Sequence, residues 1–166
     1  MPPHEMSDLK RWAKKMIPDI NSTLDALCAK LDEDSLNYCS NIKLYSSPRM
    51  AGHSVVDTVN IALGTTVVVG GTNSTDRVAF LASIQEALEY AGDEGSFPNR
   101  AFLASEEFQK KKEEVLRFFD EFARDADHLI SFWLKEGHPF YPVFWDFAFV
   151  IEKGADSYVL IGSSSD

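Results

Sequence analysis

Cysteine is scarce in this sequence, and long apolar runs are absent from it. Cys28 and Cys39 are the two cysteines, too few for a disulfide scaffold, and they lack the Cys-x-x-Cys spacing of zinc and redox sites. The stretch FYPVFWDFAFVI is shorter than the roughly 20 residues that span a bilayer, and the N-terminal residues carry no apolar signal core. We therefore expect no membrane partner, and we predict a cytoplasmic protein with reduced thiols.

Basic residues are few relative to acidic ones. The chain has 16 lysines and arginines against 26 aspartates and glutamates, which gives a formal charge of −10. Its longest basic run, Lys110 to Lys112, is followed at once by Glu113 and Glu114. Nucleic-acid binding needs clustered basic residues that release counterions from phosphates, so the composition argues against it. The same charge favours a basic protein partner through electrostatic steering.

A complete phosphate-binding motif is also missing, although one stretch invites the comparison. Residues 67–77, VVVGGTNSTDR, run from an apolar segment through two glycines into a predicted helix. Nucleotide loops carry Gly-x-Gly-x-x-Gly or end in Gly-Lys-Ser/Thr, and this stretch has neither. Asp76 would also compete with an anion for the start of the helix. We interpret the stretch as a strand-to-helix turn capped by Ser74 or Thr75, and we predict no cofactor.

The sequence does contain enough apolar material for one core. Hydrophobic residues make up 45% of the chain, as in typical globular proteins, so we expect one domain over residues 1–166. Because the predicted strands come in adjacent pairs, we predict the α+β class: an antiparallel sheet of two hairpins packed against a kinked N-terminal helix and two further helices. The apolar spacing places these elements as a helix over 7–32 kinked at Pro18, a strand over 42–45, a hairpin over 55–69, a helix over 75–91, a helix over 105–136 and a closing hairpin over 144–161.

The helix predicted over 105–136 has the most complete start and stop signals. Ser105 suits the N-cap, Glu106 and Glu107 suit the first turn, and Gly137 suits the position after the last turn. Apolar residues recur between these signals in steps of three, four or seven, which predicts a helix of about 30 residues. Such a stripe covers the sheet of its own chain or pairs two copies into a homodimer. The sequence leaves both alternatives open and favours the first.

Three polar residues are the candidates for acid–base catalysis. Asp57 and Asp146 stand among apolar neighbours in predicted strands, where burial would raise the pKa of a carboxyl group. His53 lies in the loop before the first predicted hairpin and is able to serve as a base. The alternative for each aspartate is an exposed or edge position. No sequence motif ties a nucleophile to His53.

One group of residues has the spacing of a metal site. Glu121, Asp125 and His128 follow one another at steps of four and three, so a continuous helix would present all three on one side. Helix-bundle metal sites draw such ligands from several helices, and no second pair of this kind is present in the sequence. A solvated rim beside the apolar stripe explains these residues equally well.

The segment EGHPFYPVFWDF, residues 136–147, combines two prolines with several aromatic residues. The Phe140-Tyr141-Pro142 part suits a stiff loop, and exposed aromatic side chains on a stiff loop are typical anchors of protein interfaces. We therefore predict Phe140, Tyr141 and Trp145 as binding residues. The alternative is that part of this segment belongs to the core.

Two functions from different classes follow. The first, which we favour, is a small acidic cytoplasmic protein that binds another protein, as an inhibitor, an immunity protein for a basic toxin domain or an adaptor. The second is an enzyme or ligand-binding domain with a pocket between the sheet and the last helix, using His53, Asp57, His128 or Asp146. Convergence of these four side chains in one pocket would favour the second function, and dispersal, together with an exposed acidic patch beside Tyr141, would favour the first.

Overall fold

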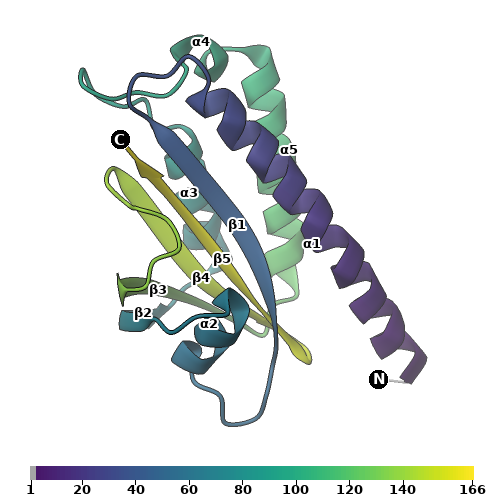
Figure 1. Cartoon of the computed structure of the whole chain (residues 1–166). Helices are drawn as coiled ribbons and strands as arrows, with labels where there is room; N and C mark the ends of the chain where they lie inside the picture. Colours follow the sequence, from purple (N-terminus) through teal and green to yellow (C-terminus); the bar gives the residue numbers. More distant parts are fainter. Residues whose placement is uncertain (1–2) are drawn as a thin grey trace.

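The protein folds around a five-stranded antiparallel sheet with the strand order β1-β5-β4-β3-β2 (Figure 1). This architecture comes from a computed structural model that describes the backbone of residues 3–166 and the side chains of residues 15–166. The α+β class and the antiparallel sheet are as predicted. The elements in chain order are α1 (Pro3–Asp32), β1 (Cys39–Pro48), α2 (Val55–Leu63), β2 (Val68–Ser74), α3 (Arg77–Leu88), α4 (Arg100–Leu103), α5 (Glu106–Arg124), β3 (His128–Glu136), β4 (Trp145–Lys153) and β5 (Asp156–Ser165).

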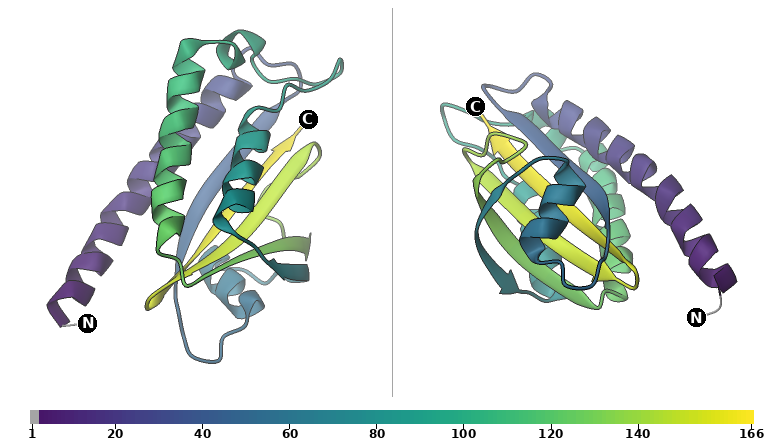
Figure 2. Two further views of the ribbon diagram at one scale, coloured as in Figure 1. Left: turned by 180° about the vertical axis from the view of Figure 1, so that it is seen from behind. Right: turned by 60° about the horizontal axis from the view of Figure 1, so that its bottom comes forward.

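Helices cover the two faces of the sheet unequally. Helices α3 and α5 lie across one face, and α1 runs along the same side close to β1, as the view from behind shows (Figure 2). The short helix α2 lies on the opposite face (Figure 2). We call the face under α3 and α5 the first face and the face under α2 the second face. Side chains alternate between these faces along each strand.

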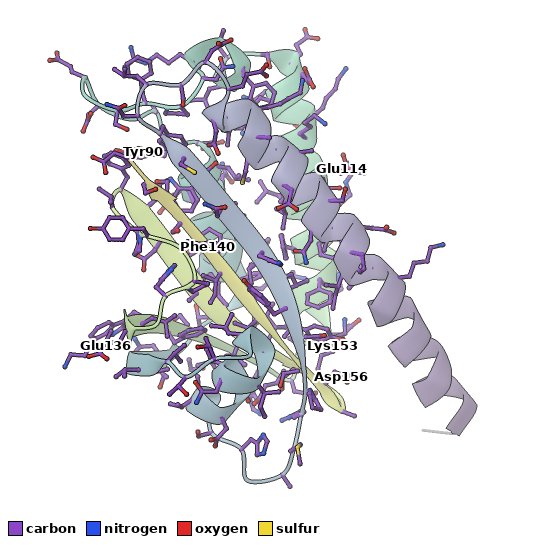
Figure 3. All side chains as sticks on the ribbon, in the orientation of Figure 1. Tyr90, Glu114, Glu136, Phe140, Lys153 and Asp156 are labelled. Carbon is purple, nitrogen blue, oxygen red and sulfur yellow. The ribbon has the colours of Figure 1, made fainter. Side chains whose placement is uncertain are left out.

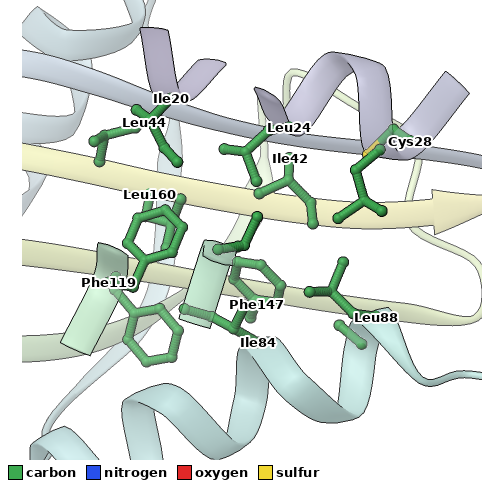
Figure 4. Close-up of a cluster of buried hydrophobic side chains, with 14 of the residues drawn as sticks. Ile20, Leu24, Cys28, Ile42, Leu44, Ile84, Leu88, Phe119, Phe147 and Leu160 are labelled. Atoms are coloured by element: carbon green, nitrogen blue, oxygen red, sulfur yellow. The ribbon is translucent and has the colours of Figure 1, made fainter. Parts of the chain in front are cut away.

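The larger hydrophobic cluster fills the space between the first face and its helices (Figure 4). The side chains at its centre come from five different elements and are excluded from solvent. Each large apolar side chain that is fully buried contributes about 1.5–3 kcal/mol to folding. The residues that show this best are Leu24 of α1, Leu44 of β1, Ile84 of α3, Phe119 of α5 and Leu160 of β5.

A smaller cluster occupies the second face. Val59 of α2 packs there against Val150 of β4 and Ile161 of β5, and none of the three is exposed. Phe140, from the segment between β3 and β4, packs against the same cluster and is partly buried. The strands β4 and β5 are therefore covered on both faces, which explains why their sequences are apolar at consecutive positions.

The first predicted hairpin, over 55–69, is wrong because residues 55–63 form helix α2. Ser54 is its N-cap and forms a capping box with Asp57, and Gly64 ends the helix in the left-handed conformation with φ of 65°. The β-branched residues of this segment favoured a strand, but the caps and the contact of Val59 with the sheet select the helix. Strand β2 therefore has its partner in β3.

The last predicted helix is too long, since α5 has 19 residues and ends at Arg124. Its apolar stripe lies in the core through Phe108, Val115 and Phe119, so this helix covers the sheet of its own chain. Residues 128–136 instead form β3. The continued spacing through Leu129 and Trp133 matched a helix by coincidence, and the homodimer predicted through a 105–136 helix has no such helix to form it.

Three smaller expectations also change. The backbone of the N-terminal segment forms one helix, α1, that includes Pro18. The side chains predicted for its apolar stripe before residue 15 lie outside the described residues. Helix α3 is capped by Asp76, whose carboxylate accepts a hydrogen bond from the Ala79 N–H at 2.8 Å, and not by Ser74 or Thr75. The closing hairpin predicted over 144–161 extends further, because β5 runs to Ser165, and Ser163 and Ser164 are each 1% exposed.

Candidate protein-binding surface

The indole ring of Trp133 packs directly against the backbone of two glycines of β2, Gly70 and Gly71. Gly71 pairs with Trp133 across the β2–β3 ladder. A Cβ atom added to Gly70 would overlap the far edge of that ring, and one added to Gly71 would lie 2.8 Å from the indole Nε1. The glycines therefore permit a close approach between a ring and a strand, which is a known use of glycine in strands. They do not form a phosphate loop, because Asp76 already occupies the start of α3.

About half of the surface of Trp133 remains exposed to solvent in this position. Its side chain alternates with Phe132 of the second-face cluster and so lies on the first face, over the edge strand β2, and the residue is 51% exposed. Val68, at the beginning of β2, is 42% exposed. Nothing in the described part of the chain covers the outer side of these two residues.

Strand β2 is an open edge of the sheet. Thr75 N–H donates to Leu129 C=O at 2.9 Å, which makes residues 75 and 129 a hydrogen-bonded pair. Antiparallel ladders alternate, so the backbone N–H and C=O groups of Ser74 and Thr72 point away from β3. Both residues are exposed. The strand order places no other described strand beyond β2, so these groups face solvent.

The opposite edge, strand β1, is sealed by α1. The side-chain amide of Asn21 donates to the Leu44 C=O and accepts from the Leu44 N–H, both at 2.8 Å. The Asp32 carboxylate accepts from the Ser40 N–H at 2.9 Å and from the Ser40 hydroxyl at 2.8 Å. These side chains satisfy edge groups that another strand would otherwise bind. The sheet therefore has one protected edge and one open edge.

The structure separates the three predicted binding residues. Phe140 lies over the middle of the second face and belongs to the hydrophobic cluster there (Figure 3). Trp145 is partly buried, donates from Nε1 to the Tyr38 hydroxyl at 3.0 Å and stacks on Phe147. Tyr141 is 75% exposed and remains an interface candidate. The stiff loop thus anchors its neighbours in the core and presents one aromatic ring to solvent.

The four polar side chains proposed for an active site do not converge. Asp146 is exposed near one end of β4, whereas His128 pairs with Glu152 near the other end of that strand, about 20 Å away at 3.3 Å per residue. His53 and Asp57 lie at the start of α2. Hydrogen bonds from the Ser54 backbone and hydroxyl lower the pKa of Asp57, so this carboxylate serves as a helix cap.

His53 nevertheless borders a polar cavity of about 380 Å³. Arg49, Thr58 and Glu152 also line this cavity, and His53 Nδ1 is buried without a hydrogen-bond partner. Arg49 is already bound to Glu152 at 3.0 Å and to Asp127 at 2.7 Å. The turn that carries Lys153 and Asp156 marks this end of the sheet, far from Glu136 at the end of β3 (Figure 3). The cavity is therefore separate from the surface around Trp133.

The proposed metal ligands do not lie on one helix. Glu121 lies on α5, Asp125 is the C-cap residue of that helix, and His128 begins β3. The helix that would have aligned them ends before His128. No group of three or more metal-binding side chains is present among the residues whose placement is described.

The comparisons with known proteins give no relative: no family model, no curated protein and no solved structure matches this chain. Within the described residues, no helix combines the length and the apolar character that crossing a bilayer requires. Sequence reasoning missed Trp133 as a surface residue because it was assigned to a helix stripe. The signal that points to it is the glycine pair within an apolar segment, which indicates that another group approaches the backbone closely.

Proposed function

We propose that this protein acts by binding another protein of basic character. The observation that carries this proposal is Trp133, a tryptophan held against the Gly70-Gly71 backbone and still 51% exposed. Tryptophan and tyrosine are the residues that most often dominate binding energy in protein interfaces. A ring that is already seated loses little conformational freedom when a partner covers it.

The charge of the chain sets the expected character of the partner. A formal charge of −10 attracts a basic protein from a distance and raises the rate of association at low ionic strength. An inhibitor, an immunity protein for a basic toxin domain or an adaptor has these properties. We place this activity in the cytoplasm, where the exposed thiol of Cys39 stays reduced.

The test is affinity capture from a lysate of the source cell, followed by mass spectrometry, with three immobilised proteins: the native chain, Trp133→Ala and Val143→Ala. Val143 is 45% exposed but lies in the segment between β3 and β4, so its variant is a matched control for loss of an exposed apolar side chain. We expect a stoichiometric basic protein that is retained by the native chain and by Val143→Ala, is released as salt rises, and is lost with Trp133→Ala.

Equal capture by Trp133→Ala would contradict the role of this surface. Absence of any stoichiometric protein at low salt would contradict the proposed function and favour the ligand-binding alternative. In that case the cavity beside His53 becomes the first place to search for a small polar ligand.

A further inference from the structure

We infer that the partner binds by adding a strand to the open edge of β2, through an extended segment that is uncharged in its middle and basic at its ends. This inference rests on the proposed function and specifies how the partner is held. An unpaired edge binds another extended backbone through main-chain hydrogen bonds, and the neighbouring side chains select its sequence.

The backbone geometry supplies the first part of the argument. The outward N–H and C=O groups of Thr72 and Ser74 repeat at the spacing of a strand ladder and have no partner in the described part of the chain. The register shifts of the β2–β3 pair lie between Val68 and Gly71, so the regular portion of the edge is the part from Gly71 to Ser74. A segment of a few residues is enough to fill it.

The regular part of the edge, from Gly71 to Ser74, lies beyond the register shifts and also lacks the side chains that usually block strand addition. Strand β2, with the sequence VVGGTNS, has no charged residue and no proline. The contrast with β1 is direct, because Asn21 and Asp32 seal that edge from α1. Of the two edges of the described sheet, only β2 is free to bind an extended segment.

Charge at the two ends of β2 specifies the ends of the partner segment. Glu136 pairs with Val68 at the first end, and Asp76 follows the second end; both are exposed. Arg77 follows Asp76 in the chain, but its side chain forms an ion pair with Asp120, with 3.3 Å between the Arg77 Nε and the Asp120 carboxylate. The negative charge of Asp76 is therefore not neutralised by Arg77. Lys135 is exposed near the first end but projects from the opposite face to Glu136. An uncharged strand with acidic ends is complementary to a segment that is uncharged in its middle and basic at its ends.

The experiment uses a fluorescent synthetic peptide, Lys-Thr-Val-Thr-Val-Thr-Lys, and measures its affinity by anisotropy. The variant Thr72→Pro removes an outward N–H without touching the β2–β3 ladder, and Thr72→Val keeps that N–H with a similar volume. We expect Thr72→Val to bind like the native chain and Thr72→Pro to bind about tenfold more weakly, because one hydrogen bond is lost and the approach is blocked. A peptide methylated on every backbone nitrogen between its two lysines has no free edge and should not bind.

Three results with the peptides would overturn the inference. They are equal binding by Thr72→Pro and Thr72→Val, equal binding of the methylated peptide, and no binding of the unmodified peptide to the native chain. Sedimentation of the native chain alone tests whether a second copy of the chain occupies this edge. A dimer that Thr72→Pro abolishes would assign the edge to that copy and would overturn the basic partner. If a protein captured through Trp133 binds Thr72→Pro normally, strand addition fails while the proposed function stands.

Discussion

At the scale of single residues, the contact between Gly70 and Trp133 defines the surface that we propose for binding. The variant Gly70→Ala puts a methyl group where the ring lies. The far end of the ring moves more easily than the strand, so we expect a loss of about 1 kcal/mol in the free energy of unfolding and a change in tryptophan fluorescence. Urea unfolding and emission spectra measure both effects.

The control for this prediction is the same substitution in the Trp133→Ala background. Without the ring, Gly70→Ala has nothing to displace, so its cost should vanish or turn into a small gain from reduced freedom of the unfolded chain. An equal loss of unfolding free energy in both backgrounds would show that the backbone conformation itself requires glycine. It would contradict the packing of the Trp133 ring against Gly70.

His138 gives a prediction for pH at the same scale. Its Nδ1 accepts a hydrogen bond from the Phe140 N–H at 3.0 Å, and burial lowers its pKa. Because the unfolded chain then binds the proton more readily, the stabilisation is complete above the ordinary histidine pKa and is lost as the pH falls through the lowered value. We expect a smaller change in unfolding free energy for His138→Gln than for the native chain between about pH 7.5 and about pH 5.5. Identical changes would contradict this account.

At the scale of elements, the seal between α1 and β1 makes a separate prediction. Asn21→Ala removes both hydrogen bonds to Leu44 and leaves its backbone groups without partners in a partly buried place. We expect a loss of about 1–3 kcal/mol in the free energy of unfolding. Ser22→Ala, an exposed neighbour on the same helix, should change it by less than about 0.5 kcal/mol.

Chemical denaturation of the two variants measures this difference. A small effect of Asn21→Ala would mean that water replaces the amide at the edge of β1. The contrast between a sealed and an open edge would then lose its basis, and so would the argument that β2 alone accepts a strand.

The sequence predicted elements well where local signals agreed with tertiary contacts. The cap at Ser105, the stripe from Phe108 to Phe119 and the alternation from Phe147 to Ile151 all point to the structures that formed. It failed at 55–63, where β-branched residues favour strands but caps decide, and at 128–136, where a strand carried the spacing of a helix. At 55–63 the local sequence does contain the deciding signals, Ser54 with Asp57 three residues later and Gly64 at the end, but the β-branched residues outweighed them in the prediction. At 128–136 the outcome depends on contacts with the sheet, which the local sequence does not encode.

At the scale of the whole molecule, the candidate site was less predictable than the fold. Tyr141 was identified as an exposed aromatic residue, and it is one. Phe140 and Trp145 were expected beside it, but the second cluster and the Tyr38 hydroxyl hold them. The open edge of β2 depends on the order of strands in the sheet, and strand order is fixed by contacts between distant segments. The net charge of the chain, by contrast, follows from its composition alone.

The most direct test of the account is amide hydrogen exchange of the chain with and without the captured partner, resolved by residue. The account predicts that the amides of Thr72 and Ser74 exchange rapidly in the free chain and become protected in the complex, while the amides of Ser40 and Leu44 are protected in both. Protection that appears elsewhere in the complex, with unchanged exchange along β2, would contradict binding at this edge.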